Sequence, residues 1–163
     1  QPLGRDIYFS WDTEQGHVEL TLADHPGALM AVQARVTGQP RWFSLGLGLG
    51  SDPFLPGQVI GLAIAHQAMP DLLVKPLIRS SQGAESREVF LANPLSAGPQ
   101  IGHQVLLHSV LPREALAVQG FAHNLVLPLP RQDFTWVIQD MRFFVQTATQ
   151  PALGLPQLGD WAV

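Results

Sequence analysis

The C-terminal part of the chain carries side chains that could recognise a sugar ring. Between residues 134 and 146, one parity of the sequence holds Trp136, Asp140 and Arg142. Because successive side chains of a strand point to opposite faces, a strand here would present a ring, an acceptor and a forked donor on one face. Sugars have apolar C–H faces and a rim of hydroxyls, which such a face complements. The alternative is a surface ion pair beside a buried Trp136.

A second candidate surface lies in residues 41–50. Gly46, Gly48 and Gly50 alternate there with Leu45, Leu47 and Leu49, which predicts a strand with a buried leucine face and a bare glycine face. Glycine inside a strand marks a place where a ring, a ligand or another backbone lies close. Trp42 stands at the end of the glycine face, and Tyr8 of the first predicted strand could share it. Either this floor is open to a ligand, or a ring from a neighbouring strand covers it.

Other chemistries find little support in the sequence. We find no nucleophile elbow, His-Glu-x-x-His pair, phosphate loop or dinucleotide fingerprint, and there is no cysteine. The six histidines lack close ligand spacing, so no catalytic metal is expected. Carboxylates such as Glu19, Glu85, Glu88, Asp133 and Asp140 are available, but sequence alone brings no two of them into one cleft, as glycan hydrolysis would require.

Composition excludes several classes of partner. Only 13% of the 163 residues are charged, the net charge is −4, and the single lysine and eight arginines form no basic stripe. Nucleic acid is therefore not an expected partner. No apolar run reaches 18 residues, so we expect no membrane insertion. The absence of cysteine fits either redox compartment; an extracytoplasmic location, periplasmic or secreted, is slightly favoured.

Period-2 patterns between frequent prolines and glycines predict an all-β protein. The predicted strands are 5–11, 17–23, 29–37, 41–50, 57–66, 71–79, 87–92, 103–110, 115–128 with a break or bend, and 134–146. A short helical turn at 112–118 is an alternative for part of this range. We expect one antiparallel two-sheet β-sandwich over residues 1–146. Residues 147–163, rich in Pro and Gly, are expected to form a strap or linker.

Two segments resemble strands of jelly-roll carbohydrate-binding modules and related galactose-binding-like domains. They are the strand entry at residues 54–62 and the closing strand at 136–143, and the resemblance extends over residues 5–146. It implies a jelly-roll fold and an oligo- or polysaccharide ligand. Many such modules also hold a structural calcium ion through carboxylates and backbone carbonyls, and Asp140 matches the last-strand motif. No other cofactor is expected.

These observations lead to one functional prediction and two alternatives. The prediction is a non-catalytic carbohydrate-binding or accessory module of a larger bacterial polysaccharide-handling protein. Its ligand-binding residues would be Trp42, Trp136, Asp140, Arg142 and Tyr8. The first alternative is a structural domain that contacts other proteins or neighbouring domains of its parent chain. The second is a β-sandwich glycan hydrolase or lyase.

Overall fold

The computed structural model describes residues 6–147. Over this range the chain forms strands joined by short turns, with a single turn of 3₁₀ helix. The elements are β1 (Ile7–Trp11), β2 (Gly16–Ala23), β3 (Met30–Gly38), β4 (Phe43–Gly50), β5 (Gln58–Met69), β6 (Leu72–Val74), β7 (Leu77–Gln82), β8 (Glu85–Phe90), β9 (Leu95–Ala97), β10 (Gly102–Ser109), η1 (Ala115–Ala117), β11 (Ala122–Pro128) and β12 (Phe134–Thr147).

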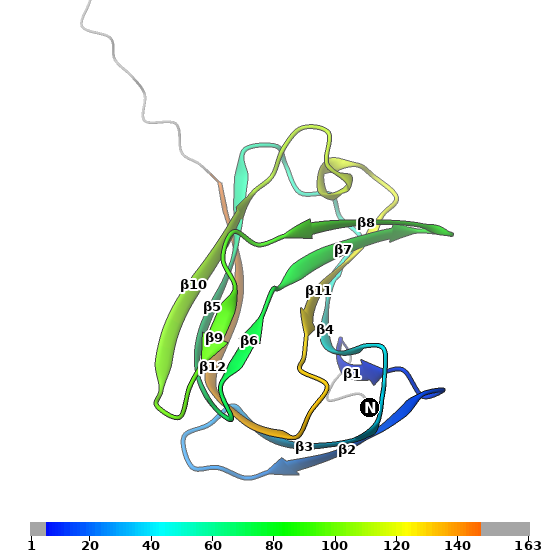
Figure 1. Ribbon diagram of the computed structural model, residues 1–163. Helices are drawn as coiled ribbons and strands as arrows, with labels where there is room; N and C mark the ends of the chain where they lie inside the picture. The colour runs from blue at the N-terminus through cyan, green and yellow to red at the C-terminus, as the bar shows by residue number, and fades with distance from the viewer. Residues whose placement is uncertain (1–5, 148–163) are drawn as a thin grey trace, which may run out of the picture.

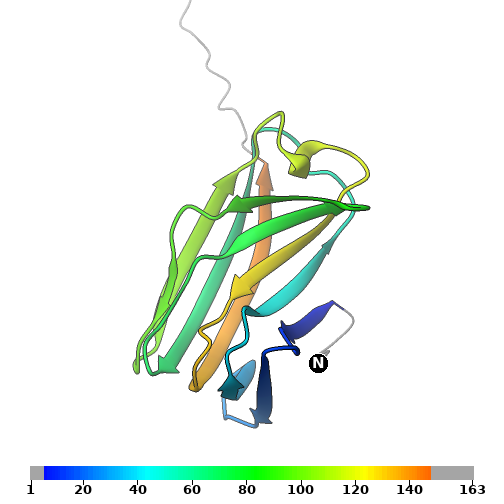
Figure 2. The same ribbon diagram turned by 45° about the vertical axis from the view of Figure 1, so that its right-hand side comes forward.

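Two antiparallel sheets of five strands pack face to face as a β-sandwich. One sheet has the order β1-β4-β11-β7-β8 and is called the front sheet below; the other, β10-β5-β12-β3-β2, is called the back sheet. Figures 1 and 2 show the two layers, with the small β6-β9 sheet along one side. The inner side chains of both sheets form one core of aliphatic and aromatic residues, as expected for an aligned sandwich. The predicted all-β sandwich is confirmed.

The predicted register of β4 is confirmed. Leu45 is completely buried, while Leu47 and Leu49 are half-buried and pack against the core. The glycines between them therefore lie on the outer face of the front sheet, opposite residues of β1 and β11. Burying Leu45 stabilises the sandwich by about 2 kcal/mol.

The closing strand departs from a simple alternation. A β-bulge between Ile138 and Asp140 inserts one extra residue into β12. Before the bulge, the even-numbered Trp136 and Ile138 face the core and are completely buried; beyond it, the odd-numbered Met141 and Phe143 pack against the core. The prediction that Trp136 shares an exposed face with Asp140 and Arg142 is therefore wrong, because the bulge exchanges the two parities.

Further differences concern element boundaries. The strand predicted at 71–79 is two strands, β6 and β7, separated around Pro76. β9 lies in a stretch predicted as turn, and the helical alternative near residue 115 is the correct one, since η1 forms there. β12 ends at Thr147, and the rest of the predicted strap lies outside the described residues.

Candidate functional site

The outer face of the front sheet carries a row of side chains that crosses all five strands. Opposed residues in the row run from Tyr8 through Gly46, Val126 and Leu77 to Phe90. Tyr8 and Phe90, at the two edges of the sheet, are 38% and 53% exposed. Four strand spacings separate them, which corresponds to about 19 Å. In Figure 1 the β7-β8 hairpin and β1 project to the right, above and below, while β11 and β4 lie set back between them.

The far end of the Tyr8 ring lies against Gly46. A Cβ atom added to Gly46 would lie 2.6 Å from Cζ of Tyr8 and 2.9 Å from its Oη, so only glycine leaves room for the ring. The ring therefore covers Gly46, whereas Asp6 lies over Gly48 and no atom lies within 4 Å of a Cβ added to Gly50. The alternative of a covering ring is correct at this position, and the ring that covers the floor remains partly exposed itself.

Beside this row the face is hollowed, with a cavity volume of about 380 Å³. The lining combines an indole, aliphatic side chains, a hydroxyl and a guanidinium: Trp42, Ser44, Leu77, Arg79, Val126 and Pro128. Trp42 is 48% exposed. Arg79 donates to Glu88 of β8 through Nε and Nη2, at 2.9 and 2.7 Å. The hollow thus offers apolar rings and polar groups, and the charges of Arg79 and Glu88 cancel each other.

A buried carboxylate holds the backbone beside Trp42. Asp12 accepts hydrogen bonds from the backbone N–H and from Nε of Arg41, at 3.1 and 2.7 Å, and the N–H of Asp12 donates to the Trp42 carbonyl. The pKa of Asp12 is lowered to about 2, mainly because its carboxylate accepts a hydrogen bond from the Arg41 side chain. The carboxylate is therefore ionised across the physiological range and keeps the start of β4 in place.

The structure brings only part of the predicted site together. Trp42 and Tyr8 share the outer face of the front sheet. Trp136 lies in the core instead, where its indole N–H donates to Nδ1 of His66 at 3.0 Å. Asp140 and Arg142 lie on the outer face of the back sheet and pair with each other at 2.9 Å. The two faces are on opposite sides of the sandwich, so these residues do not form one site.

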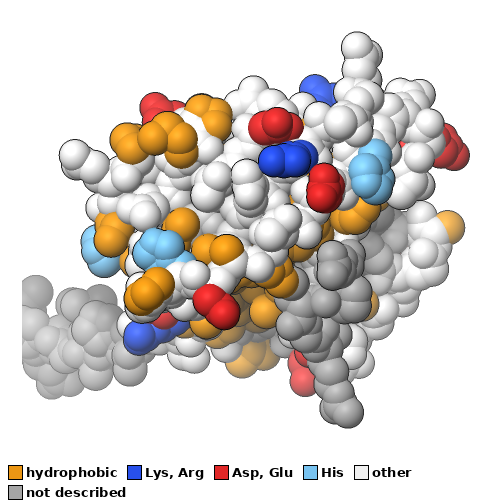
Figure 3. Space-filling model, turned by 90° about the horizontal axis from the view of Figure 1, so that it is seen from below, with side chains coloured by type: hydrophobic (Ala, Val, Ile, Leu, Met, Phe, Trp, Pro, Cys, Tyr) orange, Lys and Arg blue, Asp and Glu red, His pale blue; other side chains and the backbone are white. Residues whose placement is uncertain are grey.

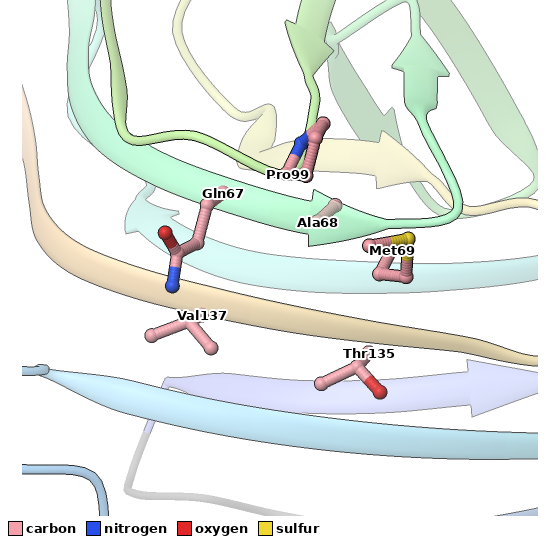
Figure 4. A pocket seen from close by; sticks show the side chains of 6 residues that line it. All are labelled: Gln67, Ala68, Met69, Pro99, Thr135 and Val137. Carbon is pink, nitrogen blue, oxygen red and sulfur yellow. The ribbon is translucent and has the colours of Figure 1, made fainter.

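The back sheet has a smaller hollow of its own, with a volume of about 210 Å³. Figure 4 shows its lining at the ends of β5 and β12, where Gln67 and Val137 approach each other beside Met69 and Thr135. The lining contains no aromatic ring and no charged group. It therefore lacks both a stacking platform and a strong hydrogen-bonding partner.

Two buried histidines belong to the core. His66 and His123 are almost completely inaccessible, and burial lowers the pKa of each imidazole. His123 shares a hydrogen bond with Ser80 at 2.9 Å. Residues 6–147 contain no group of three or more His, Asp or Glu side chains that could hold a metal ion.

The face of the molecule seen from below carries no patch of a single charge among its described residues. Seen from below, acidic, basic and hydrophobic side chains are interspersed (Figure 3). Within the described part of the chain, no helix is long and apolar enough to cross a membrane.

Sequence reasoning missed several residues of the front face. Phe90, Arg79, Glu88 and Pro128 come from β7, β8 and β11, whose order in the sheet is not visible in the sequence. One available signal was the alternation in β7, where Ile78 and Ser80 are buried and Arg79 is exposed.

No protein-family model matches the sequence, and no curated protein matches it. Several solved structures are similar to this chain. The CBM22-1 xylan-binding domain from Paenibacillus barcinonensis Xyn10C is 10% identical with a TM-score of 0.57, over 86% of each chain. A family 11 carbohydrate-binding module from Clostridium thermocellum, in complex with a β-1,3-1,4-mixed-linked tetrasaccharide, is 5% identical with a TM-score of 0.56, over 86% of this chain and 89% of the other.

A third similar structure is the enzymatically active domain of bacteriophage CBA120 tailspike protein 4. It is 13% identical with a TM-score of 0.53, over 87% of this chain and 20% of the tailspike chain. The predicted fold is thus confirmed: the chain is a jelly-roll β-sandwich of the kind found in carbohydrate-binding modules.

Proposed function

We propose that this protein binds a glycan on the outer face of its front sheet. The observation that carries the proposal is the exposure of Tyr8, Trp42 and Phe90 on one hollowed face. Partly exposed rings on a rigid sheet lose little conformational entropy on binding and offer apolar area to sugar C–H groups. The carbohydrate-binding modules among the similar structures support this assignment by analogy of fold.

Polar groups beside the rings would orient the ligand. Next to the aromatic row runs a second row from Gly48 through Asn124 and Arg79 to Glu88. Together, amide, guanidinium and carboxylate groups can donate hydrogen bonds to sugar hydroxyls and accept hydrogen bonds from them. We assign affinity to the rings and orientation to this polar row, as in other sites with few fixed polar groups.

Binding is favoured over glycan hydrolysis because the lining of the hollow includes no carboxylate. Two carboxylates border the polar row, at opposite edges of the sheet: Asp6 lies over Gly48, and Glu88 is paired with Arg79. Four strand spacings, about 19 Å, separate them. A hydrolase of the usual kind needs two carboxyl groups that flank the scissile bond. We therefore propose a non-catalytic module of a larger bacterial protein. The bacteriophage tailspike supports only the place within a larger chain, because the match covers 20% of it.

The proposal is tested by affinity electrophoresis of the protein on a panel of soluble polysaccharides. Trp42→Ala and Tyr8→Ala are each expected to weaken binding roughly tenfold or more, because an anchoring ring contributes about 2 kcal/mol. Met69→Ala is the matched control, since Met69 is also an exposed apolar residue but lies on the back sheet.

Retarded wild-type protein, weakened ring variants and an unchanged Met69→Ala variant would support the assignment. If no polysaccharide retards the wild type, or if the ring variants bind as well as the wild type, the structural-domain alternative replaces it.

A further inference from the structure

Among the described residues, half of β12 has an edge without a strand partner. Over Thr135–Ile138 the strand lies between β5 and β3, but β3 begins at Met30, opposite Ile138. From Asp140 to Thr147 the strand pairs with β5 alone. An exposed edge of this kind is a template for another strand unless it is blocked.

The direction of the free backbone groups follows from the pairing before the bulge. The Ile138 carbonyl accepts the Leu29 N–H, so core-facing residues of β12 direct their backbone groups toward the β3 side. In an antiparallel ladder, the backbone N–H and C=O groups of successive residues point to alternate edges of the strand, in step with side chains that point to alternate faces. Beyond the bulge the residues of this parity are Met141, Phe143, Val145 and Thr147. Among residues 6–147, no hydrogen bond outside the β ladders reaches their backbone groups.

We propose that this edge pairs with the same edge of a second copy of the chain, antiparallel about a two-fold axis through Phe144. This register uses all four free residues of each copy, with Met141 opposite Thr147 and Phe143 opposite Val145 of the second copy. Backbone groups that would otherwise need water are then paired across the axis. In this register Thr147 of the second copy, the last described residue of its strand, lies opposite Met141.

The side chains of this register are compatible on both faces. On the inner face, the half-buried Met141 and Phe143 and the 44% exposed Val145 extend the apolar core across the axis. On the outer face, Arg142 lies opposite the uncharged Gln146 of the second copy, so no like charges meet. The Phe144 ring is turned over Gly61 of β5 and leaves the centre clear. A strand-edge partner of different sequence would not gain this two-fold match.

The inference is independent of the proposed function. The free edge belongs to the back sheet, and the candidate glycan face belongs to the front sheet. Pairing would leave both glycan faces of the dimer accessible.

Sedimentation velocity over a concentration series tests the proposal. We expect the wild type to pass from monomer to dimer between about 1 µM and 1 mM, the range of weak specific complexes. Val145→Pro removes an N–H that faces the free edge and not β5, and proline is tolerated at such edge positions. It is expected to remain monomeric with an unchanged circular dichroism spectrum, whereas Val145→Ala keeps the N–H and dimerises. Val145→Lys, which places a charge at the interface, is expected to remain monomeric as well.

The register has its own test, because the chain contains no cysteine. Arg142 and Gln146 of the second copy would be opposed at a non-hydrogen-bonded position, about 4.5 Å apart at Cα, which suits a disulfide. An equimolar mixture of Arg142→Cys and Gln146→Cys is expected to cross-link under mild oxidation as the mixed dimer, and neither variant with itself. A wild type that stays monomeric, a Val145→Pro variant that dimerises, or cross-links without preference for the mixed pair would overturn the proposal.

Discussion

A substitution at the contact between Tyr8 and Gly46 is expected to weaken glycan binding while it leaves the stability of the fold almost unchanged. Gly46→Ala would place a methyl group 2.6 Å from Cζ and 2.8 Å from Cε2 of Tyr8. Carbon atoms in contact normally lie about 3.5–4.0 Å apart, so the ring must move outward by about 1 Å. The clashing atoms are the far end of a partly exposed side chain, which can rotate, and not backbone.

The cost to the fold is therefore small. Alanine in place of a strand glycine stabilises by about 0.5–1 kcal/mol, which offsets much of the lost contact between ring and glycine. We expect the free energy of unfolding of Gly46→Ala to stay within about 1 kcal/mol of the wild type. A tilted ring no longer offers its flat face, however, so affinity for the polysaccharide should fall roughly tenfold, toward that of Tyr8→Ala.

Urea unfolding and affinity electrophoresis measure the two quantities. Gly48→Ala is the matched control on the same strand and face, because its methyl group would meet the side chain of Asp6, with Cβ at 3.3 Å and Oδ1 at 3.5 Å, and not the Tyr8 ring. Gly61→Ala is a second control, since it displaces the Phe144 ring on the opposite sheet. If Gly46→Ala binds like the wild type while Tyr8→Ala does not, the flat ring is not the binding platform and the reasoning is refuted.

Four further outcomes are expected. Trp136→Ala should lower the free energy of unfolding by about 3–5 kcal/mol in urea denaturation, because it opens a core cavity beside His66; a loss below about 1 kcal/mol would contradict its burial. Burial lowers the folded-state pKa of His66 and His123, so the fold favours the neutral form of both imidazoles. Their contribution to stability should be fully present above about pH 6.5, the ordinary pKa of histidine, and should decrease as the pH falls below it. His123→Asn should reduce this dependence in urea titrations at a series of pH values. Arg142→Ala, on the back sheet, should leave affinity electrophoresis unchanged, and a loss comparable with that of Trp42→Ala would place the ligand elsewhere. A calcium titration followed by melting temperature should show at most a modest stabilisation, by mass action on a structural site, whereas a transition metal bound in stoichiometric amount would contradict the expectation of no catalytic metal.

The fold was accessible from the sequence because period-2 patterns dominate it. Proline and glycine placed most strand ends correctly, and the alternating leucines of β4 gave its register. Pro76 divided one predicted strand because proline cannot donate to the ladder. The strand β9 was missed because it has only three residues and pairs with an equally short β6.

The candidate site was less accessible. Trp42 was recognised because it stands beside a run of glycines, and Tyr8 because it lies on the polar parity of the first predicted strand. The sheet order places both on one face. Phe90 and Arg79 join that face only through the order of β11, β7 and β8, which depends on long-range pairing and leaves no local signal. Trp136 was misplaced because a bulge changes the face of every later residue in its strand, and nothing local distinguishes Gln139 as the extra residue.

The bulge also determines where this strand tolerates changes of length. Removing Gln139 alone would leave Ile138 and Met141 inward and Arg142 outward, since the ladder would simply become regular. Removing any single residue between Met141 and Val145 would instead turn the remaining residues of the strand over. Insertions and deletions are usually confined to loops. In this domain an alignment gap of one residue is also permitted inside a core strand, at position 139, and a homologue that lacks this residue would keep the same inward and outward faces.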